Sequence, residues 1–242
     1  MSEHRRYAHA PITEAVIEIR ISHDGERSMA DLERLTHELT PAYSNPSVIS
    51  MGSGQITLGS QVGATARSQP IGYLFRGDEG KHLLQAKIDG FALSRLAPYT
   101  SWATFRDEAQ GLFAKYAQFI RPTKVVRLAT RYINKFDLPG PTVELKEYFA
   151  TYPEAPADHV LSGFYMQLTL DHNDLEARSI INLTGVGPTS PEVVSVILDI
   201  DVFREGEFEV GDRIWELLDS LREREYSLFE ASITDLARQL ID

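Results

Sequence analysis

Alternation of apolar and polar residues with a period of two is the feature that most limits how this chain can fold. Two segments show it clearly, Glu14–Ile21 near the start and Val125–Phe136 in the middle of the chain. This period is typical of a strand that buries one face and exposes the other. The chain is therefore predicted to build a sheet with one face on a core and one polar face.

Helical spacing of apolar residues appears between the strand-like segments. In residues 32–43, apolar side chains recur every three or four positions behind a capping box at Ser28. The same spacing runs through residues 102–119, from a cap at Ser101 to a stop at Pro122. Both segments are predicted to be amphipathic helices.

The remaining segments predict further strands and two further helices. They are short edge strands within 45–70, strands at 71–75, 82–88 and 91–96, a helix at 142–150, strands at 164–170, 179–184 and 192–203, and a helix at 211–242. The order strand, helix, strands, helix thus occurs twice. It predicts two structurally similar halves, 11–121 and 123–242, within a single structural unit of residues 1–242.

The fold expected from this order is α+β. Two pseudo-repeated β-α-β(n)-α halves would form one curved antiparallel sheet with helices on one side. They are expected to share that sheet because the junction Arg121-Pro122-Thr123 lacks the composition of a linker. A closed antiparallel β tunnel with flanking helices is the alternative architecture.

Composition limits the functions that such a sheet could serve. The chain has 24 Lys and Arg residues against 35 Asp and Glu residues, a formal net charge of −11, and no cysteine. These numbers exclude a disulfide scaffold, a Cys-ligated metal site and a cysteine nucleophile, and they disfavour non-specific binding to nucleic acid. No apolar run is long enough for a membrane span or a signal peptide, so a cytoplasmic protein without membrane contacts is expected.

The strand at 125–136 carries the most informative side chains. Its odd positions place Arg127, Arg131 and Lys135 on one face. Successive cations in this row are four residues, or about 13 Å, apart. Three cations in one row repel each other, so the pattern predicts anionic groups beside this strand. The even positions are expected to face the core: Val126, Leu128, Thr130, Tyr132 and Phe136.

Acidic residues occupy the polar faces of two other strands. Asp199 and Asp201 lie on the strand at 192–203, and Glu14, Glu18 and Arg20 lie on the first strand. If the helices cover one side of the sheet, the other side is a concave face with four carboxylates and four basic groups. The carboxylates are candidate ligands for Mg²⁺ or Mn²⁺, with the basic stripe holding a polyanion. The alternative is a set of ion pairs between neighbouring strands.

Other motifs indicate no particular chemistry. The seven histidines lack metal-ligand spacing, and no nucleophile elbow, P-loop or dinucleotide fingerprint occurs. Residues 171–174 contain oxygen ligands but are interpreted as a hairpin turn. The apolar stripe from Trp215 to Leu240 is expected to pack on the sheet, with a homodimer seam along part of this C-terminal helix as the alternative.

Three segments together resemble a known family: Ala10–Arg20 (APITEAVIEIR), Arg127–Lys135 (RLATRYINK) and Phe229–Asp235 (FEASITD). Leu96–Tyr99 followed by Trp102 also fits, so the resemblance spans nearly the full chain. The chain is similar to a sporadically distributed prokaryotic family of proteins of similar length that has no assigned function. The resemblance implies no catalytic residues. The patchy distribution of the family implies an accessory or mobile-element gene, for example one concerned with defence.

Two functions follow from these patterns. The first is a non-catalytic binding or assembly module without a cofactor, in which Arg20, Arg127, Arg131 and Lys135 on the open sheet face contact a protein partner or an anionic ligand. The second is a metal-dependent phosphohydrolase or phosphotransferase acting on a nucleotide or polyphosphate, similar to the tunnel enzymes that act on triphosphates. Its metal ligands would be Glu14, Glu18, Asp199 and Asp201, although the spacing of the two glutamates departs from the Glu-x-Glu pattern of those enzymes.

Overall fold

The structure, a computed structural model, describes residues 5, 7–39, 42–57, 63–159, 161–187, 190 and 192–242. The strands in these residues are β1 (Ile12–Ser22), β2 (Tyr43–Thr57), β3 (Gly63–Gly77), β4 (His82–Lys87), β5 (Gly90–Leu96), β6 (Lys124–Pro139), β7 (Tyr165–His172), β8 (Ala177–Val186) and β9 (Val193–Phe208). The helices are α1 (Met29–Leu39), α2 (Trp102–Ile120), α3 (Arg213–Ser232) and α4 (Asp235–Ile241), with short 3-10 turns η1 (Asp78–Gly80) and η2 (Leu145–Glu147).

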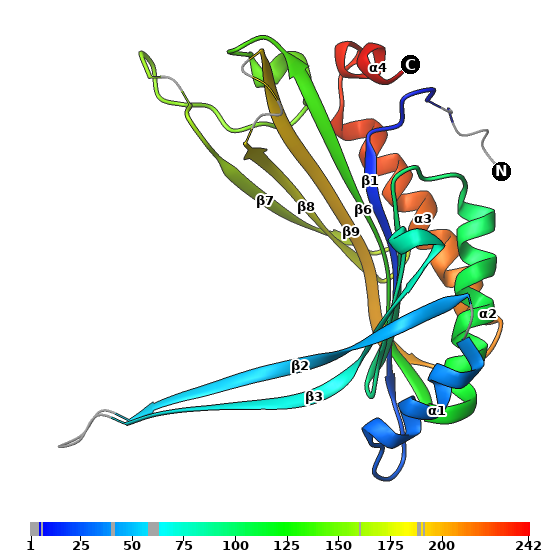
Figure 1. Cartoon of the computed structure of the whole chain (residues 1–242). Helices are drawn as coiled ribbons and strands as arrows, with labels where there is room; N and C mark the ends of the chain where they lie inside the picture. The colour runs from blue at the N-terminus through cyan, green and yellow to red at the C-terminus, as the bar shows by residue number, and fades with distance from the viewer. Residues whose placement is uncertain are drawn as a thin grey trace.

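All the strands belong to a single antiparallel sheet in the order β2-β3-β4-β5-β1-β6-β9-β8-β7. β1 and β6 lie together at the centre of the sheet (Figure 1). The strands β2 to β5, which follow β1 in the chain, lie on the β1 side, and β7 to β9, which follow β6, lie on the β6 side. The sheet is not closed, because β2 and β7 form two separate edges. The α+β class with one large antiparallel sheet is therefore confirmed, and the closed tunnel is wrong.

The central strands bury the face that their alternation predicts. Ala15, Ile17 and Ile19 of β1 are fully buried. On β9, Ile200 is fully buried and Leu198 is 1% exposed. Alternate side chains of a strand point to opposite sides of the sheet, so these residues share one core-facing side. The same alternation places the polar side chains of both strands on the other side.

The predicted phase of β6 needs one correction at its start. Val125 is fully buried, whereas Val126 is only partly buried. In the pairing with β1, Ile21 lies opposite Val125 and Arg20 lies opposite Arg127, so Val126 is the extra residue of a β-bulge. The bulge puts Val125 in the core and still leaves Arg127 on the polar face.

In Figure 1, α2 and α3 lie against one side of the curved sheet. α2 contacts this side where Phe113 meets Phe91 of β5, with ring centres 5.6 Å apart, and α3 contacts it where Phe229 stacks on Phe136 of β6 at 6.4 Å. The predicted start of α2 is confirmed, because the Ser101 hydroxyl accepts a hydrogen bond from the backbone of the first turn. No helix in the described ranges is long and apolar enough to cross a membrane.

The predicted helices at 142–150 and 211–242 are both interrupted. The first contains only the turn η2, and the second is divided into α3 and α4. The reason is a contact between them: Phe149 and Ile233 form an antiparallel β-bridge, which holds the backbone of Ile233 extended. The side chain of Thr234 then caps the new helix α4.

A buried polar cluster joins α3 to β6. The guanidinium carbon of Arg222 lies 5.1 Å from the ring centre of Tyr132, and Arg222 Nη1 lies 3.7 Å from Glu225 Oε2. The hydroxyl of Tyr132 is hydrogen-bonded to that of Tyr99 at 2.9 Å. Burial raises the pKa of the Glu225 carboxyl to about 7, although Arg222 acts in the opposite direction. Arg222 and Glu225 of α3 are thus packed between this helix and the sheet.

Replacing Glu225 by Gln is expected to change how stability depends on pH. The pKa of this carboxyl is raised from 4.5 to about 7 on folding. The free energy of unfolding of the wild type therefore falls as pH rises from 4.5 to about 7, and Glu225 causes no such loss below pH 4.5. We expect the free energy of unfolding of E225Q, relative to that of the wild type, to increase by about 2 kcal/mol when the pH is raised from 5 to 7.5. Urea denaturation of both proteins at each pH measures this difference. A difference between the two proteins that does not vary with pH would contradict this.

Candidate functional site

The basic residues of β6 have acidic strands on both sides, because β6 lies between β1 and β9. Arg131 pairs directly with Asp201 of β9, and Ala129 pairs with Glu18 of β1. Directly paired residues in an antiparallel sheet point to the same side. The basic stripe and its acidic neighbours therefore share one face, which we call the open face, opposite the side on which Phe136 contacts α3.

Arg127 is held in place by three neighbours and is only 9% exposed. Its Nη1 lies 3.2 Å from Glu18 Oε2, and its Nη2 donates to Asp201 Oδ2 at 3.0 Å. The guanidinium also stacks on Phe203, with its carbon 4.5 Å from the ring centre. Burial raises the pKa of the Asp201 carboxyl, and Arg127 offsets this only in part. Arg127 thus compensates two carboxylates within the sheet.

Arg131 forms a two-pronged contact with a buried carboxylate. Its Nε and Nη2 donate to the two oxygens of Asp199, each at 2.7 Å, and Asn182 donates to the same carboxylate at 3.1 Å. The hydrogen bond to Asp199 raises the pKa of Arg131. The Arg131 side chain is nevertheless 46% exposed. This geometry fixes an arginine in orientation while leaving about half of its surface accessible from solvent.

The other two predicted basic residues are also paired. Arg20 Nε donates to Glu18 Oε1 at 2.5 Å, and Lys135 Nζ lies 2.9 Å from Asp137 Oδ1. Arg20 is exposed, whereas Lys135 keeps about a quarter of its side-chain surface. Each of the four predicted cations therefore has a carboxylate partner, on a neighbouring strand for Arg127 and Arg131 and on the same strand for Arg20 and Lys135.

The four predicted metal ligands are not brought to a common point. Glu14 and Asp199 lie in one row on opposite sides of β6, about two strand spacings or 10 Å apart at Cα. Glu18 and Asp201 are separated by the guanidinium of Arg127. Across the residues with described positions, no three His, Asp or Glu side chains form a group that could hold a metal ion. The metal site stays a prediction, and the cations that contact Glu18, Asp199 and Asp201 here are arginines.

The open face continues onto β8 and β7 through residues that were not predicted. Tyr165 donates to Asn182 Oδ1 at 2.9 Å, and Gln167 donates to the same oxygen at 2.8 Å. Tyr165 is 64% exposed. Arg178 lies 5.2 Å from the Phe203 ring centre, which Arg127 also contacts. The sequence signal for these residues was the alternation of polar and apolar side chains in 165–172 and 177–186. The register of β7 and β8 with β9 then places the polar positions on the open face.

Two histidines lie in contacts that resemble catalytic pairs. His172 Nε2 lies 3.0 Å from Ser179 Oγ, while Arg224 donates to His172 Nδ1 at 2.8 Å. Because an arginine only donates, Nδ1 carries no proton and Nε2–H donates to the serine, so His172 cannot accept the proton of Ser179. Burial also lowers the pKa of His172. Arg95 donates to His82 Nε2 at 3.0 Å in a similar way.

No model of a known protein family matches this chain, and no curated protein sequence matches it. The family resemblance carried by residues 10–20, 127–135 and 229–235 therefore stays a prediction. The function has to be argued from the geometry of the open face.

Replacing Arg127 by Ala is expected to lower the free energy of unfolding by roughly 2–4 kcal/mol, because two partly buried carboxylates would lose their shared cation. The matched control is Arg20→Ala, which removes an exposed partner of the same Glu18 and should cost less than about 1 kcal/mol. Denaturant unfolding of both variants measures the difference. Equal losses would show that burial of Arg127 does not govern its contribution.

Proposed function

We infer that this chain is a non-catalytic binding or assembly module that uses the open face to recognise a polypeptide partner. The charge balance of the face supports a polypeptide over a phosphate-like anion. Arg20, Arg127, Arg131 and Lys135 each have a carboxylate within 3.2 Å. A free anion would find no uncompensated positive charge there, whereas a peptide with both signs of charge can complement such a surface.

The observation that carries this proposal is the geometry of Arg131. Its guanidinium is fixed by Asp199 at two atoms but remains 46% exposed. A partner that binds it loses little side-chain entropy, because the arginine is already held in one orientation. The exposed ring of Tyr165 lies on the same face, and tyrosine and arginine are the residue types most enriched at the energetic centres of interfaces.

The proposal includes the finer arrangement predicted from the sequence, two pseudo-equivalent halves with their helices on one side of the sheet. The symmetric strand order supports it, since β5 flanks β1 and β9 flanks β6 at the centre. Such an arrangement leaves one broad face without helices. That face is then available to a partner along β1, β6, β9, β8 and β7.

The test compares variants of the full-length chain, each tagged and recovered from its native cells with bound proteins quantified by mass spectrometry. Arg131→Gln combined with Asp199→Asn removes both members of the pair, so that no buried carboxylate loses its partner. Tyr165→Ala removes the exposed ring. We expect each variant to reduce recovery of the specific partner by about tenfold or more at an unchanged melting temperature.

The matched control is Arg34→Ala, which removes an exposed arginine from α1 on the helix side of the sheet. It should recover the partner as wild type does. Identical protein sets and amounts from the wild type, the control and the open-face variants would overturn the proposal.

A further inference from the structure

The strand β7 forms one edge of the sheet and pairs only with β8 (Figure 1). The backbone N–H of Gly185 donates to the Phe164 carbonyl, which continues this pairing and fixes its phase. In an antiparallel pair, the backbone groups of alternate residues point toward the partner strand and away from it. We call the residues of β7 whose N–H and C=O groups point away from β8 the outer row: Tyr165, Gln167, Thr169 and Asp171. In the described part of the chain, no hydrogen bond links these backbone groups to another residue.

The other edge strand of the sheet, β2, has features that hinder pairing with a further strand. It contains Pro46, and its register with β3 shifts after Ser44 and again after Ile49. Proline and β-bulges are common means by which proteins protect sheet edges. In contrast, β7 contains no proline, glycine or lysine, and its eight residues pair with β8 without a register shift. β7 is therefore a regular edge whose outward backbone groups are open to a further strand.

Side-chain contacts at both ends hold β7 in place. Near its start, Tyr165 and Gln167 each donate to the side-chain oxygen of Asn182 on β8. At its end, Arg224 of α3 donates to His172 Nδ1 at 2.8 Å. A strand that is already fixed loses little conformational entropy when a second strand pairs with it.

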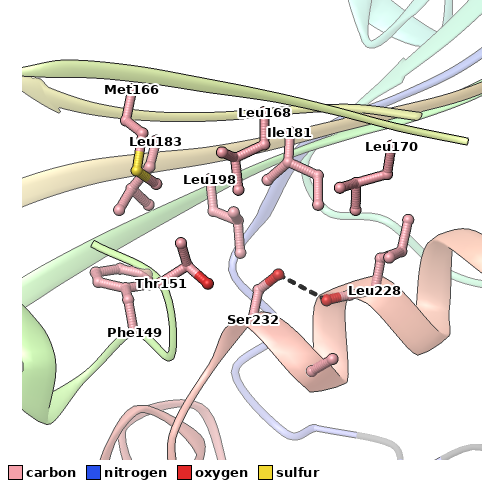
Figure 2. A pocket seen from close by; sticks show the side chains of 11 residues that line it. Phe149, Thr151, Met166, Leu168, Leu170, Ile181, Leu183, Leu198, Leu228 and Ser232 are labelled. Carbon is pink, nitrogen blue, oxygen red and sulfur yellow. Dashed lines mark hydrogen bonds between the residues drawn. The ribbon is translucent and has the colours of Figure 1, made fainter. Parts of the chain in front are cut away.

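The side of β7 that faces away from the open face is apolar and borders a hollow of about 230 Å³ (Figure 2). Met166, Leu168 and Leu170 point into this hollow, which lies between them and α3. The residues deeper in it, such as Leu183 and Leu198, are already buried within the chain. Leu170 is 37% exposed, so the apolar surface that a further strand would cover lies on β7 itself.

We propose that β7 binds an extended segment of a partner protein, which is added to the sheet as a further strand. The occupant is a polypeptide strand because its alternating N–H and C=O groups match those of the outer row at the usual strand spacing of about 4.8 Å. The inference rests on the proposed function, because one side of the added strand continues the open face beside Tyr165. It names the form that the partner takes at the margin of that face.

Charge favours a partner protein over a second copy of this chain at the β7 edge. Each copy has a formal net charge of −11, which opposes the approach of two identical edges. The outer row contains one charged side chain, that of Asp171, and no cation. A basic residue of the segment that lies opposite Asp171 would complement it. The expected segment thus alternates apolar residues on the α3 side with neutral or basic polar residues on the open face.

Selection of binders from a displayed library of random peptides, with the full-length chain as bait, is the first test. We expect the enriched peptides to alternate apolar and polar residues, and amide hydrogen exchange then locates a synthetic peptide of the most enriched sequence. In the free chain, the amides of Met166 and Leu168 are protected by β8, whereas those of the outer row exchange quickly. The bound peptide should protect the outer row. A library without alternating binders, or protection that does not include the outer row, would overturn the proposal.

The variant Thr169→Pro tests the backbone contact directly. Proline removes one outward N–H but leaves the hydrogen bonds between β7 and β8 in place, because the N–H of Thr169 points away from β8. We expect it to bind the selected peptide at least tenfold more weakly than wild type. The matched control, Thr169→Ala, keeps the N–H and should bind as wild type does. Equal binding by the two variants would overturn the proposal, and the hydrogen-exchange test stands even if the proline variant does not fold.

Recovery of the cellular partner separates failure of this inference from failure of the proposed function. If Thr169→Pro recovers the partner as wild type does while the Arg131→Gln and Asp199→Asn double variant does not, the open face binds its partner without strand addition. Sedimentation equilibrium tests for a second copy at the same edge. A wild-type chain that dimerises, together with a Thr169→Pro chain that does not, would place that copy on β7 and overturn the proposal.

Discussion

The pairing of β6 with β1 on one side and β9 on the other is the constraint on which the rest of the structure depends. β6 carries a row of cations that would repel one another in isolation. Glu18 from β1 and Asp201 from β9 meet at Arg127, so the pairing compensates charge across three strands at once. The same pairing joins β1 to β6 at the centre of one continuous sheet.

The two sides of this sheet have different chemistry because alternate residues of each strand point in opposite directions. On one side, Tyr132 and Phe136 of β6 contact α3 through rings and through the buried Arg222. On the other, Arg131 and its neighbours form a polar network that reaches Tyr165 on the edge strand.

Local patterns predicted much of the fold correctly. The alternation of β1 and the serine cap of α2 depend on residues close together in the chain, and both were confirmed. The helices predicted at 142–150 and 211–242 were wrong in extent because Phe149 pairs with Ile233. That bridge joins residues far apart in sequence, so no local periodicity could indicate it. The bulge at Val126 escaped prediction for the same reason, since it exists only in the pairing of β6 with β1.

The sequence by itself determined which residues share a face along the regular stretches of the strands, and hence that Arg127 and Arg131 would lie together on a polar surface. It also determined the excess of acidic residues and the presence of carboxylates on two other strands. Only the tertiary structure decided that those carboxylates contact arginines and do not converge on a common point. The physical reason is that side-chain direction follows from backbone geometry within one strand, whereas the neighbours of a side chain follow from strand order and register across the sheet.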